Sequence, residues 1–145
     1  MTTKITSESL PKDEISLEEQ INSLVTDLYY PSESDEKIAY FEMQFSTAEK
    51  LSLANFRMFN GIRPELTIQE IDFEKFFAPL INIEDWFGDD EKKWAEDSLK
   101  LKQLLSQRLE DILILKVGET EMDVYLVGKA EESKWEGLKT KIIET

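Results

Sequence analysis

The chain has 145 residues, of which 41% are hydrophobic and 33% are charged. A chain of this length and composition is expected to form one soluble globular domain with an ordinary hydrophobic core. It contains no cysteine and no histidine. That absence excludes disulfides, thiol nucleophiles, Cys/His zinc sites and every catalytic triad with a histidine base.

Acidic residues outnumber basic ones by 31 to 17, so the formal net charge is −14. Direct binding to nucleic acid is not expected, because it requires cationic side chains that displace phosphate counterions. A basic protein partner fits this charge, although acidity can also serve solubility alone. No apolar run approaches the ~18 residues of a membrane span, and the first residues lack the apolar segment of a secretory signal. We therefore expect a cytoplasmic protein without membrane contact.

The first half of the chain predicts alternating helices and strands. Residues 1–14 are polar and aperiodic, which indicates a flexible arm. Ser16 and Glu19 form a capping box, and apolar residues follow at helical spacing. In chain order we expect a helix over 17–28, an acidic loop over 32–36, a strand over 38–45, a helix from Ser46 or Thr47 to Phe59 ended by Asn60 and Gly61, and a strand over 66–71.

The second half has clearer signals. Asp72 is a candidate N-cap for a short helical turn rich in Phe, and a loop over 83–90 leads into a long amphipathic helix that starts at Asp89 or Asp90 and ends near Leu109. Strict alternation then predicts strands. We expect them over 112–117, 121–127 and 138–143, with a turn at 118–120 and a loop over 128–137. Strands and at least three helices in mixed order predict an α+β or layered α/β/α fold.

Carboxylate pairs such as Asp89 and Asp90 could in principle perform acid–base catalysis, but with 31 acidic residues such pairs arise by chance. The glycines are scattered at turns and form no phosphate loop, and the acidic runs lack EF-hand ligand spacing. We therefore expect neither an enzyme nor a bound cofactor.

Two features are candidates for binding a partner. Trp86 lies among charged residues in a predicted surface loop, where aromatic residues are common interface anchors, although it could also fold back onto the core. The last predicted strand ends two residues before the end of the sequence, which leaves Glu144 and Thr145 projecting. Their carboxylate and hydroxyl oxygens suit a magnesium ion or an arginine cluster on a partner.

Several motifs occur together in this chain. They are GETEMDVYLVG at residues 118–128, GLKTKIIET at 137–145, Ser-Glu-Ser at 32–34, Asp-Trp at 85–86, and an Ile-Asp pair followed by two Phe at 71–77. Over about residues 17–145, and most specifically in the last third, the sequence resembles the nuclease A inhibitor-like family.

The resemblance implies a single inhibitor-like domain over residues 15–145, built as a three-layer α/β/α sandwich around a mixed, mainly antiparallel sheet of about four strands. Such proteins inhibit sugar-non-specific DNA/RNA endonucleases, which use one magnesium or manganese ion, and they do so in one-to-one complexes. By the resemblance, Thr145 would reach the catalytic metal of the partner nuclease, Glu33 within its Ser-Glu-Ser loop would engage basic groups, and Trp86 would pack at the interface. The expected partner-binding residues are Ser32, Glu33, Ser34, Glu84, Trp86, Glu144 and Thr145.

The chain departs from the family pattern at two places within the domain, and its N-terminal arm is also longer. Glu84 stands where the family can carry an amide, which exchanges a hydrogen-bond donor for an acceptor and implies a different matching group on the partner. Residues 47–64 have a more helical pattern than the family loop. An alternative function therefore remains open, in which the same fold serves as an acidic adaptor or immunity-type protein for a different basic partner.

Overall fold

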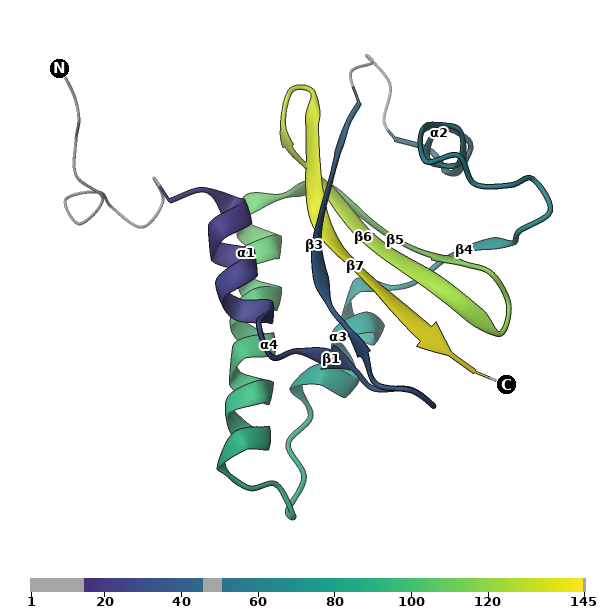
Figure 1. Cartoon of the computed structure of the whole chain (residues 1–145). Helices are drawn as coiled ribbons and strands as arrows, with labels where there is room; N and C mark the ends of the chain where they lie inside the picture. The colour runs from purple at the N-terminus through teal and green to yellow at the C-terminus, as the bar shows by residue number, and fades with distance from the viewer. Residues whose placement is uncertain (1–14, 46–50, 145) are drawn as a thin grey trace, which may run out of the picture.

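A five-stranded antiparallel sheet, with strands in the order β3-β7-β6-β5-β4, forms the centre of the protein (Figure 1). The computed structural model describes residues 15–45 and 51–144. The elements are α1 (Leu17–Val25), β1 (Tyr29–Tyr30), β2 (Glu36–Lys37), β3 (Ala39–Gln44), α2 (Leu53–Phe59), β4 (Ile68–Glu70), α3 (Phe73–Ile81), α4 (Asp89–Arg108), β5 (Glu110–Val117), β6 (Glu121–Glu131) and β7 (Lys134–Ile143). The mixed α+β class predicted from the sequence is confirmed.

The sheet of about four strands that the family resemblance implied is not confirmed. The sheet has five strands instead of four, and β1 and β2 form an additional two-stranded hairpin. Every pairing in both sheets is antiparallel. The two residues predicted to end the first helix, Tyr29 and Tyr30, form β1 instead, because α1 stops at Val25. The Lys37 ammonium from β2 donates to the main-chain carbonyls of Val25 and Thr26, and this satisfies the end of the helix.

The loop predicted over residues 128–137 is also wrong. Strand β6 continues to Glu131 and β7 begins at Lys134, so a tight hairpin replaces the loop. The two glycines that suggested a loop are required by close packing. A Cβ on Gly128 would lie 2.7 Å from the Cβ of Leu109, and a Cβ on Gly137 would lie 1.7 Å from the main-chain oxygen of Leu126. Glycine in a strand here marks a close approach of neighbouring elements.

Helices α1, α3 and α4 cover one face of the sheet (Figure 1). Their starts follow the predicted local signals. The Ser16 hydroxyl accepts from the Glu19 N–H at 3.1 Å, and the Asp72 carboxylate accepts from the Lys75 N–H at 3.2 Å. Apolar side chains from these helices and from the sheet form the larger core. Its fully buried members include Ile21, Leu28, Ile38, Phe76, Phe77, Leu101, Leu105, Ile114, Leu126 and Leu138.

A smaller core lies on the opposite face, beneath α2. Phe56 is fully buried there against Tyr125, and their ring centroids are 5.0 Å apart. The predicted helix ends correctly at Asn60, but its cap is Ser52, because the Ser52 hydroxyl accepts from the Asn55 N–H at 3.1 Å. The predicted cap residues Ser46 and Thr47 lie outside the described residues. Among those residues, α2 is the only helix on this face, so the full three-layer arrangement stays a prediction.

The predicted boundaries of the remaining elements shift by a few residues. The strand predicted over 66–71 covers only Ile68–Glu70, and the turn after Asp72 extends into a nine-residue helix. The predicted start of the long helix at Asp89 is confirmed. None of the helices within residues 15–45 and 51–144 is long and apolar enough to cross a membrane.

Candidate functional site

The Ser-Glu-Ser segment forms the loop between β1 and β2 and is hydrogen-bonded to the end of β7. The Ser32 hydroxyl oxygen accepts from the Ile143 N–H at 3.2 Å. The Glu33 N–H donates to the Ile143 carbonyl, also at 3.2 Å. Strand β3 pairs with β7 only as far as Lys139, so the loop extends the hydrogen bonding along the edge that β3 leaves uncovered. Residues 111 positions apart in the sequence therefore share one edge.

The loop is ordered by its own hydroxyl groups. The Ser32 hydroxyl donates to the Ser34 carbonyl at 2.7 Å, and the Ser34 hydroxyl donates to a Glu36 carboxylate oxygen at 2.6 Å. Local bonds of this kind are the reason that serine is favoured in turns. The loop presents Glu33 as an exposed residue on a fixed backbone. A partner that engaged Glu33 would have little loop ordering left to perform.

The last described residue is held from the other side. The Glu144 N–H donates to the Thr120 carbonyl at 2.8 Å, from the turn between β5 and β6. The chain is thus bonded at Ile143 to the Ser-Glu-Ser loop and at Glu144 to the neighbouring turn. Glu144 itself is exposed. Thr145, the residue predicted to reach a metal ion, lies outside the described residues.

A hollow of about 460 Å³ lies beside this chain end. Its lining includes Tyr30, Glu33, Lys116 and Glu144. Tyr30 is buried, stacks on the Phe76 ring at 4.8 Å between centroids, and donates its hydroxyl proton to the Phe76 carbonyl at 2.7 Å. Burial, together with the nearby Glu144 carboxylate, raises the pKa of Tyr30 to about 12. The lining of the hollow therefore combines a neutral aromatic side chain with two glutamates and one lysine.

Trp86 and Glu84 border a second, mainly apolar hollow of about 210 Å³. This hollow and the one beside the chain end share Pro31 and Pro79 in their linings, so the two adjoin. The Trp86 side chain is 73% exposed and meets the Phe87 ring edge-on at 4.7 Å between centroids. Of the two alternatives left open by the sequence, folding back onto the core is thus excluded.

Of the predicted site residues that the structure describes, all but Ser34 therefore line one of two adjoining hollows, and Ser34 is hydrogen-bonded to Ser32 beside them. Sequence reasoning missed Tyr30, Pro31 and Pro79, which line them. Tyr30 and Pro31 were interpreted only as the end of a helix, and no local signal predicts that Tyr30 contacts a residue 46 positions away. Within residues 15–45 and 51–144, no group of three or more acidic side chains is placed to hold a metal ion. The arrangement suits recognition of a partner surface.

The model of the nuclease A inhibitor-like protein family matches residues 15–145, nearly the whole chain. The chain belongs to the nuclease A inhibitor-like family. No curated protein matches it. The family description is that of a nuclease inhibitor, and the matched residues include the Ser-Glu-Ser loop, the Trp86 loop and the last strand.

Proposed function

We propose that the protein inhibits a metal-dependent, sugar-non-specific DNA/RNA endonuclease in a one-to-one complex by occupying its active site. In this mechanism Thr145 supplies an oxygen ligand to the catalytic metal ion of the nuclease, where a scissile phosphate would otherwise bind. Glu33 and Glu144 then take the place of phosphate oxygens against the basic groups that line a nucleic-acid groove.

One observation carries the proposal most strongly. Ile143 is hydrogen-bonded to both Ser32 and Glu33, so an acidic loop and the end of the last strand form one rigid unit. A plug of this kind must present its oxygens in a fixed arrangement, because ordering them on binding would cost affinity. The net charge of −14 supports a cationic partner and rapid, electrostatically steered association.

The exposed Trp86 beside the same end supports an apolar anchor at the edge of this interface. Large aromatic side chains at such positions commonly dominate binding energy. Glu84, next to it, would accept a hydrogen bond from the partner where an amide could also donate one, so it is a candidate determinant of which nuclease is recognised.

The proposal is tested by titrating the protein into a magnesium-dependent non-specific endonuclease. Removing Thr145, or changing Glu33→Lys, should weaken inhibition at least about 100-fold, because each change removes a charge-assisted or metal contact at the centre of the interface. The matched control is Glu132→Lys, which makes the same charge change in the hairpin at the other end of β7 and should retain inhibition. If the variant without Thr145 and the Glu33→Lys variant both inhibit as well as the parent, the plug mechanism is wrong. Capture of a non-nuclease partner together with no inhibition by the parent would support the acidic adaptor alternative.

A further inference from the structure

Strand β3 forms a free edge of the five-stranded sheet, because within that sheet it pairs only with β7 (Figure 1). Its six residues pair with β7 in an unbroken register from Ala39 to Gln44. The opposite edge strand, β4, has only three residues. Proteins usually protect an edge by a short strand, a bulge, a proline or several charges. Strand β4 is protected by its length, whereas β3 has neither bulge nor proline and only one charged residue, Glu42.

The main-chain groups of β3 face β7 and the outer edge in alternation. The Phe45 N–H donates to the Ser133 carbonyl at 3.0 Å, in the hairpin between β6 and β7, so the odd-numbered residues of β3 face β7. Ile38 faces the other way, and its N–H donates to the Leu28 carbonyl at 3.1 Å. The even-numbered residues of β3 therefore direct their N–H and C=O groups outward, where no described residue hydrogen-bonds to them. They are Tyr40, Glu42 and Gln44.

Exposed apolar side chains lie beside the end of this edge. Phe59, from α2, meets the Phe45 ring edge-on at 4.9 Å between centroids and is 51% exposed. Met58 and Leu53 in the same helix are 71% and 40% exposed. Phe41, in β3, packs at the margin of the same smaller core. An added strand would thus meet both free hydrogen-bonding groups and apolar surface, the two components of recognition by strand addition.

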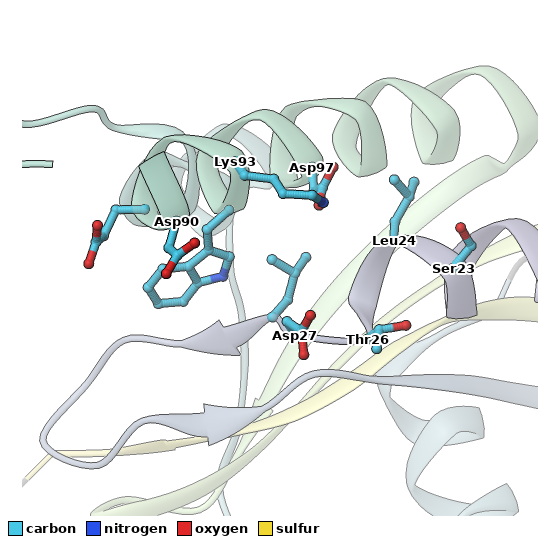
Figure 2. Close-up of a pocket in the computed structure, with 10 residues that line it drawn as sticks. Ser23, Leu24, Thr26, Asp27, Asp90, Lys93 and Asp97 are labelled. Atoms are coloured by element: carbon cyan, nitrogen blue, oxygen red, sulfur yellow. The ribbon is translucent and has the colours of Figure 1, made fainter. Parts of the chain in front are cut away.

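The local charge indicates which partner fits this edge. Residues 39–45 and 51–64 contain one acidic and two basic side chains, in a chain of net charge −14. The acidic excess therefore lies elsewhere, as in the hollow between α1 and α4, where Figure 2 shows three aspartates and one lysine. They are Asp27, Asp90, Asp97 and Lys93. A second copy of the chain meets the least repulsion at the β3 edge, and a strongly basic nuclease gains no attraction there.

We propose that β3 pairs in antiparallel orientation with β3 of a second copy of this chain. A two-fold axis relates identical antiparallel strands, so each copy offers the donors and acceptors that the other lacks. The contact is closed, because each copy uses the one long edge that its sheet leaves free.

The alternation of main-chain groups restricts the position of this axis. Hydrogen-bonded pairs require outward-facing residues in both strands, so the axis passes through Phe41, Glu42 or the next residue. A centre at Phe41 would place Gln44 of the second copy opposite Ile38. The Leu28 main chain already occupies the outer side of Ile38. A centre at Glu42 would place two carboxylates directly opposite each other, which is destabilising.

A centre at Met43 avoids both conflicts. It places Phe41 opposite Phe45 of the second copy, so aromatic side chains on the α2 face meet across the axis. It also pairs Glu42 with the neutral Gln44. We therefore infer that the two strands pair about Met43.

This dimer should leave both candidate inhibitory sites open. Met43 pairs with Trp135 near the start of β7, whereas the Ser-Glu-Ser loop is bonded to Ile143 at its end. Each copy can then bind one nuclease. The inference does not depend on the proposed function, because association is measured on the inhibitor alone.

Analytical ultracentrifugation of the whole chain tests the inference. With rising concentration the apparent mass of the parent should increase from 16.9 kDa toward twice that value, with half-association at roughly 10–100 µM, as suits a small interface. Gln44→Pro removes an outward N–H that β7 does not use and should raise the dissociation constant at least about 10-fold. Gln44→Ala keeps that N–H and should associate like the parent. Circular dichroism checks that each variant is folded.

A second control addresses proline itself. The Ile71 N–H donates to the Ile114 carbonyl, so the preceding Glu70 faces outward from β4. Glu70→Pro should therefore associate like the parent. A parent that stays at 16.9 kDa up to about 1 mM, or a folded Gln44→Pro variant that associates like the parent, overturns the proposal.

The register has its own test, because the chain contains no cysteine. Opposed Cα atoms in a non-hydrogen-bonded pair are about 4.5 Å apart, which a disulfide can span. Met43→Cys should therefore form a disulfide-linked dimer under oxidising conditions, whereas Phe41→Cys and Glu42→Cys should stay mostly monomeric. A linked dimer of either of these two, without one of Met43→Cys, overturns the proposed pairing.

A nuclease titration distinguishes the other occupant of this edge. If the parent stays monomeric while Gln44→Pro weakens inhibition of the endonuclease, β3 receives a strand of the nuclease and the proposed dimer is wrong. If the parent dimerises but does not inhibit, the plug mechanism fails and the dimer stands.

Discussion

Ser32 connects the Ser-Glu-Ser loop to the last strand, β7. Replacing Ser32 should distinguish the stability of the fold from the position of this loop relative to Ile143 as causes of inhibition. Ser32→Ala eliminates the hydroxyl that accepts from the Ile143 N–H and donates to the Ser34 carbonyl. The Glu33 N–H still donates to the Ile143 carbonyl, so the loop is loosened without being released. The Ser32 hydroxyl also accepts from the Ser34 N–H at a longer 3.4 Å. Because Ser32 is half-buried, each of the two shorter bonds is expected to lie in the lower half of the usual range, at about 0.5–1 kcal/mol, which predicts a loss of about 1–2 kcal/mol in the free energy of unfolding.

That loss corresponds to a decrease of about 3–6 °C in Tm for a chain of this size. The expected effect on inhibition comes from ordering the loop again upon binding. A cost of about 0.5–1.5 kcal/mol for this step predicts an inhibition constant about 2- to 10-fold higher than that of the parent.

The matched control is Ser52→Ala, which removes the cap of α2 on the opposite face of the sheet. It should lower stability by about 1 kcal/mol and leave inhibition unchanged. Nuclease titration and thermal denaturation of both variants give the comparison. If Ser32→Ala loses the expected stability but inhibits like the parent, the hydrogen bond between Ser32 and Ile143 does not position the binding residues, and the prediction is wrong.

Two further predictions concern the fold around this site. Tyr30→Phe removes the hydrogen bond to the Phe76 carbonyl and should lower the free energy of unfolding at pH 7 by about 1 kcal/mol. Because burial and Glu144 raise the pKa of Tyr30 from 10.0 to about 12, the unfolded chain releases this proton first. The free energy of unfolding of the parent should therefore decrease between pH 10 and 12 more steeply than that of the variant. Urea unfolding at several pH values measures this, and an equal decrease with pH in both proteins would contradict it. Gly137→Ala should prevent folding or cost more than about 3 kcal/mol, as measured by circular dichroism, because its Cβ would lie 1.7 Å from the Leu126 carbonyl oxygen. A well-folded variant with parental Tm would show that β6 and β7 can separate there.

Features that depend on neighbouring residues were predicted from the sequence by itself. The caps Ser16 and Asp72 act on an N–H three residues ahead, so their chemistry can be recognised in a short window. For the same reason, the alternation over residues 121–127 correctly predicted a strand that begins at Glu121, although β6 continues to Glu131. Composition determined the charge and excluded cysteine and histidine chemistry, and the motifs identified the family before any fold was known.

Features that depend on distant residues required the tertiary structure. The hydrogen bond between Ser32 and Ile143 joins positions 111 apart, and no local pattern encodes that separation. The sequence around Gly128 and Gly137 is compatible with a loop as well as with a strand. Only the close packing of Leu109 against Gly128 and of Leu126 against Gly137 shows why glycine is needed within these strands. Trp86 could have packed inside or outside, because its neighbours allow either. Packing leaves its side chain 73% exposed at an apolar hollow that Pro31, Pro79 and Leu80 also line, and Pro31 comes from a distant part of the chain that only the folded structure brings there.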